Sequence, residues 1–177
     1  MINLVKNVAL IGHGYWGQKI RSSILKNKNL RLLFIADKDK KNLFFQYKRP
    51  SYTKLILDFN DIDLKKIDAV FIVTPAKTHY KIAKYFLNKN INVFIEKPIT
   101  LNIKDFQTLE KISKKNKKIL MSGDLYLYNP AINLIKKKII NNFLGKIKYI
   151  EFNRLNCGIV RSDINLIENL SSHDISI

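Results

Sequence analysis

The chain has 177 residues, of which 46% are hydrophobic and 26% charged, a balance typical of a folded globular protein and too apolar for a disordered one. This length allows one complete domain and part of a second. The formal net charge of +18 permits nucleic-acid binding, but no zinc-ligand, helix-turn-helix or aromatic RNA-binding pattern accompanies it. Because the lysines are scattered over expected helix surfaces, we interpret the charge as a compositional bias and expect no nucleic-acid partner.

The sequence also indicates no membrane segment, disulfide or metal site. Its longest apolar runs, such as residues 69–73, are far shorter than a membrane span, and residues 1–8 lack the pattern of a secretory signal. Cys157 is the one cysteine, and the three histidines are widely spaced, which excludes an internal disulfide and offers no metal-ligand spacing. We therefore expect a cytoplasmic protein without a bound metal.

Apolar runs and amphipathic stretches alternate along the first two thirds of the chain. Strands are expected at residues 7–11, 30–36, 69–73, 92–95 and 118–121, and helices at residues 15–26, 78–87 and 102–115. Such alternation is typical of an α/β protein with a parallel sheet covered on both faces, as in the doubly wound Rossmann-type fold.

Beyond Gly123 the pattern changes. A helix is expected from Asn129-Pro130 to about Lys138, followed by one longer strand over residues 146–153. We therefore place a domain boundary near residue 123, with residues 1–122 as the Rossmann-type domain. Residues 123–177 would begin a second, α+β domain that is incomplete.

A glycine-rich motif lies between the first expected strand and the first expected helix. Gly12-His13-Gly14-Tyr15-Trp16-Gly17 matches G-x-G-x-x-G, and this strand-to-helix context distinguishes a dinucleotide-binding loop from an ordinary glycine-rich turn. The first glycine permits the tight turn, the second lets the backbone approach a pyrophosphate, and the third lets the helix pack close to the strand. The intervening His13 is expected to be a spacer that faces solvent.

An acidic residue completes this fingerprint. Asp37 lies 20 residues beyond Gly17, at the end of the next expected strand, where it would accept hydrogen bonds from the adenosine ribose hydroxyls. Its negative charge opposes a 2′-phosphate and favours NAD over NADP, although Lys38, Lys40 and Lys41 weaken that preference.

Further motifs resemble the Gfo/Idh/MocA oxidoreductases, the family of glucose–fructose oxidoreductase and inositol dehydrogenase. The resemblance rests on the glycine loop with Trp16, on residues 68–79 with Thr74-Pro75 and His79, and on Glu96-Lys97-Pro98. It continues through Gly123-Asp124-x-Tyr126-x-Tyr128-Asn129-Pro130, Leu144-Gly145-x-Ile147, residues 161–165 and Ser172-His173-Asp174. These motifs occur in order and together cover essentially the whole chain.

The resemblance implies hydride transfer between NAD(P) and a hydroxyl or ketone of a free or nucleotide-linked sugar. Lys97 would lie beside the nicotinamide and the reacting hydroxyl, with Pro98 in a cis bond, and His173 would exchange the hydroxyl proton. A base with a pKa near neutrality and a nearby ammonium suit this chemistry. Many relatives carry aspartate four residues before the histidine, where this chain has Asn169, so His173 would act alone or with Lys97.

Other candidates follow from the same motifs, each with a structural alternative. The remaining cofactor candidates are Tyr15, Trp16, Thr74, Pro75, His79 and Glu96. Lys97 could be one more surface lysine, and His79 could cap a helix. Tyr128 and Asn129 are substrate candidates, although an aromatic residue before Asn-Pro is also ordinary at a helix start.

The resemblance also implies a longer protein. Family members carry a large sheet in a second domain that supplies substrate contacts and often an oligomer interface, so we expect a truncated form, a homo-oligomer or a missing C-terminal half. A non-catalytic module that binds NAD(H) stays an alternative function, and a nucleic-acid binder a third.

Overall fold

The computed structural model describes residues 5–44, 49–153 and 174–175. The chain divides into two compact units, residues 1–122 and residues 123–177, and each is described by itself. No helix in the described residues is long and apolar enough to cross a membrane.

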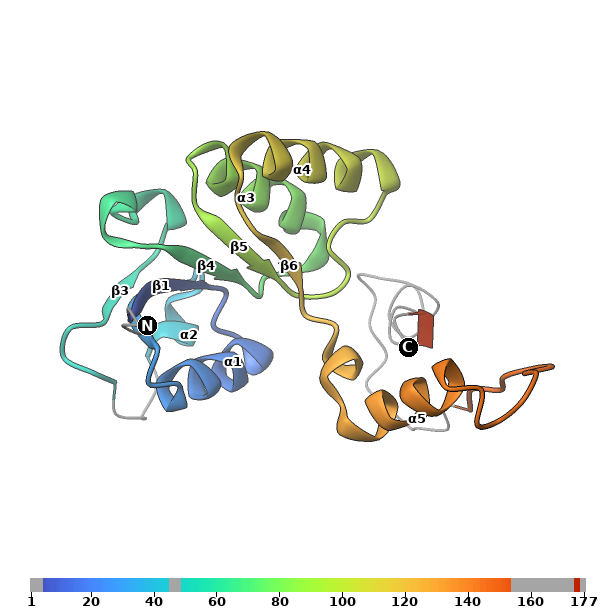
Figure 1. The fold of residues 1–177 in the computed structure, drawn as a ribbon. Coiled ribbons are helices and arrows are strands. Elements are labelled where there is room, and N and C mark those ends of the chain that lie inside the picture. The colour runs from blue at the N-terminus through green and yellow to red at the C-terminus, as the bar shows by residue number, and fades with distance from the viewer. Residues whose placement is uncertain (1–4, 45–48, 154–173, 176–177) are drawn as a thin grey trace. The chain divides into compact units, whose positions relative to one another are not determined.

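The first unit is built on a six-stranded sheet in which every neighbouring pair is parallel (Figure 1). The strand order is β3-β2-β1-β4-β5-β6, so the chain changes direction across the sheet between β1 and β4, the switch point at which such folds bind ligands. The strands are β1 Lys6–Ile11, β2 Leu30–Ala36, β3 Lys54–Ile56, β4 Ala69–Ile72, β5 Asn92–Ile95 and β6 Leu120–Ser122. This topology confirms the predicted doubly wound Rossmann fold.

Helices cover both faces of this sheet, as Figure 1 shows. On one face, Ile24 of α1 (Tyr15–Lys26) and Leu43 of α2 (Lys40–Leu43) pack against buried residues of β1 and β2. On the other face, Phe86 of α3 (Ala76–Asn88) and Leu109 of α4 (Ile103–Asn116) belong to the larger core with β4 and β5. Short 3-10 helices at Phe59–Asp61 and Leu64–Lys66 lead into β4.

The described part of the second unit contains a 3-10 helix, Leu125–Tyr128, and the helix α5, Pro130–Ile140. The predicted helix after Asn129 is therefore confirmed. The predicted strand over residues 146–153 is wrong, because these residues form neither helix nor strand and are exposed. A strand needs a neighbour for its backbone hydrogen bonds, and the described residues of this unit include no other strand that could supply them.

Candidate functional site

The carboxyl ends of four neighbouring strands form one aligned row. Ile11 of β1 pairs with Ala36 of β2 and with Ile72 of β4, which in turn pairs with Ile95 of β5. Backbone hydrogen bonds extend the row by one residue, from Gly12 N–H to the Ala36 carbonyl and from Glu96 N–H to the Ile72 carbonyl. The predicted motifs, which are distant in sequence, therefore leave the sheet side by side at one edge.

Two glycines of the loop after β1 are required by the protein's own packing. Gly12 has φ +90°, and a Cβ there would lie 2.6 Å from the carbonyl oxygen of Val73. A Cβ on Gly17 would collide with the carbonyl oxygen of Gly12. The loop and the first turn of α1 are therefore closer to each other, and to the end of β4, than any side chain would allow.

Gly14 differs from both. Its backbone (φ −65°, ψ −164°) suits any residue, and no atom in the described part of the chain lies within 4 Å of where its Cβ would be. Gly14 is the N-cap of α1, and within the described residues no side chain caps this helix and its first turn has no acidic residue. Free N–H groups and the positive end of the helix dipole thus face open space, which suits an anion.

The aromatic residues of the loop, Tyr15 and Trp16, begin α1 and are exposed. The Tyr15 ring lies 5.5 Å from the Lys19 ammonium.

Asp37 joins the end of β2 to the glycine loop. Its Oδ2 accepts hydrogen bonds from the backbone N–H of His13 (2.7 Å) and from the Asn42 side chain (3.1 Å), and its Oδ1 accepts one from Asp39 N–H (2.9 Å). The contribution of Asn42 was not predicted, because nothing in its sequence surroundings distinguishes it from the many other asparagines.

His13 does not face solvent, and that expectation is wrong. Its side chain is fully buried, and its Nδ1 donates to the Asn42 carbonyl at 2.6 Å, since a carbonyl can only accept. Burial lowers the pKa of His13, an effect that the Asn42 hydrogen bond opposes and the nearby Arg21 charge reinforces. The ring therefore connects the glycine loop, through the Asn42 carbonyl, to α2.

The turns after β4 and β5 carry the remaining candidates of the first unit. Pro75 is exposed, whereas Thr74 and Lys97 are partly buried and Glu96 is buried. The Lys97–Pro98 peptide bond is cis, as the resemblance implied. His79 lies in the first turn of α3, where its ring nitrogens contact the Pro98 and Thr74 carbonyls.

The second-domain candidates lie in the other unit or outside the described residues. Tyr128 is exposed, and Asn129 is the N-cap of α5, with its side-chain oxygen accepting from Ala131 N–H at 2.9 Å. That contact agrees with the helix-start alternative for Asn129. His173 and Asn169 lie outside the described residues.

Comparison with known proteins agrees with the site's geometry. Residues 6–124 match the family model described as "Oxidoreductase family, NAD-binding Rossmann fold". The chain belongs to the Gfo/Idh/MocA oxidoreductase family. The first unit is thus an NAD-binding Rossmann domain, and the loop, the uncapped start of α1 and the open space at Gly14 fit that cofactor.

This chain matches only part of the length of each of its relatives. The chain is 31% identical to UDP-N-acetylglucosamine 3-dehydrogenase of Acidithiobacillus ferrooxidans, over 66% of this chain and 36% of the dehydrogenase. Myo-inositol 2-dehydrogenase of Lactobacillus plantarum has a similar structure (TM-score 0.71, 28% identity, 80% of this chain and 43% of that one). The fold is also that of scyllo-inositol dehydrogenase of Lactobacillus casei with NAD(H) and scyllo-inositol (TM-score 0.73, 23% identity, 80% and 42%). The chain spans less than half the length of these relatives.

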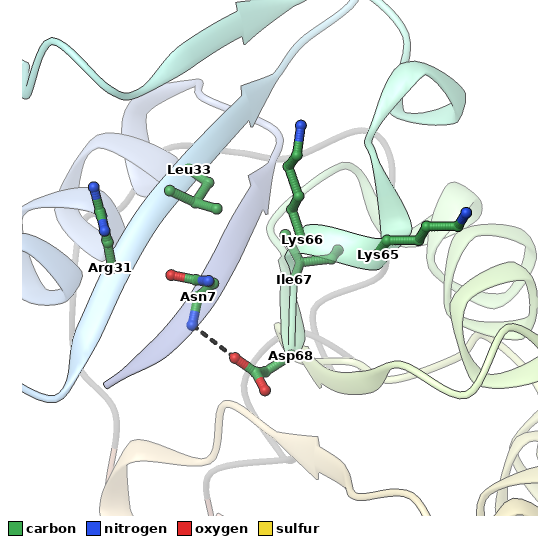
Figure 2. Close-up of a pocket in the computed structure, with 7 residues that line it drawn as sticks. All are labelled: Asn7, Arg31, Leu33, Lys65, Lys66, Ile67 and Asp68. Atoms are coloured by element: carbon green, nitrogen blue, oxygen red, sulfur yellow. Dashed lines mark hydrogen bonds between the residues drawn. The ribbon is translucent and has the colours of Figure 1, made fainter. Parts of the chain in front are cut away.

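A pocket of about 530 Å³ lies at the opposite, amino-terminal edge of the sheet. Its lining includes Asn7 near the start of β1, Arg31 near the start of β2 and Asp68 just before β4. In Figure 2 the Lys65 and Lys66 ammonium groups extend away from Asp68 rather than converging on a common point. The glycine loop, in contrast, follows the carboxyl end of β1. Among the described residues no cluster of metal ligands occurs either.

Proposed function

We propose that this chain binds NAD(H) at the edge formed by β1, β2, β4 and β5, as the nucleotide-binding part of an oxidoreductase that acts on a sugar or nucleotide sugar. The observation that carries the proposal is the contrast among the three loop glycines. Packing within the protein explains Gly12 and Gly17. Nothing in the described structure requires glycine at position 14, whereas a pyrophosphate that approaches the backbone there would.

The surrounding groups suit a dinucleotide from one end to the other. Asp37 would receive the ribose hydroxyls, and its charge would disfavour a 2′-phosphate, so NAD is the proposed cofactor. The first-turn N–H groups of α1 would bind the pyrophosphate, with Tyr15 and Trp16 beside it. The turns that carry Thr74-Pro75 and Glu96-Lys97 would then border the nicotinamide.

The proposed chemistry divides between cofactor and protein. When bound, the nicotinamide supplies the hydride acceptor or donor. Lys97 would hold the substrate oxygen through its ammonium and stabilise alkoxide character there. His173 would take or return the hydroxyl proton. Tyr128 and Asn129 are proposed substrate contacts.

The relatives support the substrate class. UDP-N-acetylglucosamine and the inositols, which appear in the names of three relatives, are polyhydroxylated rings. A ring with secondary hydroxyl groups is therefore the proposed substrate. Since the chain spans less than half the length of these relatives, a non-catalytic NAD(H)-binding module is the second candidate. Formation of NADH from NAD⁺ with sugars or nucleotide sugars would separate the two.

Titration with NADH, followed by its fluorescence, tests cofactor binding. Gly14→Val should weaken binding by about tenfold or more, because its side chain would occupy space needed by the pyrophosphate. Thermal unfolding should stay close to wild type, since a Cβ at position 14 has no atom of the described structure within 4 Å. Ser22→Val, an exposed change on the same helix, is the matched control and should bind normally. Equal binding by wild type and Gly14→Val would contradict the proposal.

A further inference from the structure

His79 is buried between two turns of the proposed cofactor edge. Its side chain is 1% exposed. Its Nδ1 lies 2.8 Å from the carbonyl oxygen of Pro98, and its Nε2 lies 2.7 Å from the carbonyl oxygen of Thr74. One carbonyl belongs to the turn that leaves β4, and the other to the turn that leaves β5.

Both contacts have the length of hydrogen bonds, and both oxygens are acceptors only. The ring donates an N–H to at least one of these carbonyls, and its other nitrogen lies within hydrogen-bond distance of the second. Such a ring has no freedom to rotate without breaking a bond to one turn or the other. The imidazole thus fixes the separation of two backbone segments that the sheet alone joins only at their strands.

We propose that His79 is a positioning residue for the nicotinamide end of the site, because it fixes the Thr74-Pro75 turn against the Lys97-Pro98 turn. The proposal rests on the function proposed above. His79 is too buried to exchange protons with a substrate, so it acts through the backbone on either side of it. Lys97 directly precedes the residue whose carbonyl His79 binds, and its backbone placement therefore depends on this contact.

The role differs from that of a histidine that only fills the core. A core residue would affect the whole site through stability, whereas His79 should affect one end of it. The pyrophosphate and adenosine end depends on Gly14, Asp37 and the start of α1, which follow β1 and β2, whereas the two turns that His79 contacts follow β4 and β5. ADP-ribose, which contains every part of NADH except the nicotinamide, is therefore the probe for that end.

The experiment compares NADH with ADP-ribose on the full chain. Wild type should bind NADH more tightly than ADP-ribose. In His79→Phe this advantage should fall by about threefold to tenfold, the range expected for losing one net hydrogen bond at the nicotinamide end, while ADP-ribose binding stays near wild type. Phe86→Leu, a buried change in the same helix and away from both turns, is the matched control for lost stability and should keep the advantage.

A second variant makes the test independent of whether His79→Phe folds. His79→Gln, whose single amide nitrogen can keep one of the two contacts, should lose less of the NADH advantage than His79→Phe.

An unchanged NADH advantage in the His79 variants, or an equal loss for both ligands, would overturn the proposal. If wild type binds neither NADH nor ADP-ribose, the proposed function itself fails, and this inference fails with it.

Discussion

Asp37 serves the glycine loop and is placed to serve a ligand as well. Its Oδ2 already accepts two hydrogen bonds, including the one from His13 N–H, whereas its Oδ1 accepts only the one from Asp39 N–H among the described contacts. Since each carboxylate oxygen has two lone pairs, Oδ1 retains capacity for a ribose hydroxyl. The residue that would select the cofactor therefore also shapes the loop that would bind it.

This double role predicts different outcomes for two substitutions. Asp37→Ala leaves the His13 N–H without its acceptor and should lower the free energy of unfolding by about 1 to 3 kcal/mol, as measured by urea denaturation. Asp37→Asn keeps an oxygen at that position, so it should retain most of the stability. Its loss of charge should narrow the preference for NADH over NADPH in competitive titrations. If Asp37→Ala were as stable as wild type, the carboxylate would not be supporting the loop.

His13 predicts a pH dependence of stability. Burial lowers its pKa in the folded protein below the ordinary value of 6.5, so between these two values the unfolded chain binds more protons than the folded one. The corresponding contribution to stability is fully present above pH 6.5 and is lost as the pH falls from there through the lowered pKa. His13→Gln removes the titrating group and should flatten the unfolding free energy across that window.

The measurement is urea denaturation at several pH values, with wild type and His13→Gln compared at each. Taking the difference cancels the titration of groups common to both proteins. Parallel pH profiles for the two proteins would mean that the His13 ring titrates in the folded state as it does in the unfolded chain.

At the level of elements, the sequence predicted the parts of the sheet that form the site. β2 and β5 have their predicted bounds, and α1 begins and ends where expected. These segments are continuous apolar runs or regular amphipathic stretches, so the local pattern and the final burial agree. The cofactor motifs were placed correctly on the sheet edge because each directly follows such a strand.

The predictions that the structure contradicts, and the strand that was not predicted, have a common physical cause. β3 was missed because its three residues, Lys54–Ile56, include an exposed lysine and no buried residue. The strand expected at residues 146–153 has suitable side chains but lacks a partner among the described residues. His13 is buried through its contact with Asn42, 29 residues away. In each case a distant segment determines the outcome, and a local pattern does not report it.

The junction of β1 and α1 predicts a large loss of stability for one glycine-to-alanine mutation and a small loss for another. Gly17→Ala places a methyl group against the Gly12 carbonyl and should destabilise the protein by about 1 to 3 kcal/mol or more. Gly14→Ala meets no described atom and should cost less than about 1 kcal/mol, yet it should weaken NADH binding. Thermal unfolding and NADH titration of both variants would test this, and equal stabilities would contradict the close packing of loop and helix.

At the scale of the whole molecule, the two units differ in how well their apolar residues are buried. The first unit contains two continuous cores, one on each face of the sheet. In the described part of the second unit, Ile140, Phe143 and Ile150 are 73%, 70% and 62% exposed. Burial of apolar surface is the main favourable term in folding, so the first unit has the greater stabilisation of its own.

This difference predicts the pattern of amide hydrogen exchange in the full chain. Amides of β1, β4 and β5 lie in the centre of a parallel ladder and should exchange only through global unfolding of the first unit. Residues 146–153 form no helix or strand and are exposed, so they should exchange within the earliest time points. α5 has helical hydrogen bonds but few buried contacts, and it should exchange at an intermediate rate.

Saturating NADH should slow exchange in the glycine loop and the first turn of α1, because a ligand that binds only the folded state raises its stability. The Gly14→Val variant should show the same central protection without the NADH effect, which separates folding of the unit from occupancy of its site. Protection of residues 146–153 equal to that of β1 would show that this segment pairs with a partner in solution, and the division into a well-packed and a poorly packed unit would then be wrong.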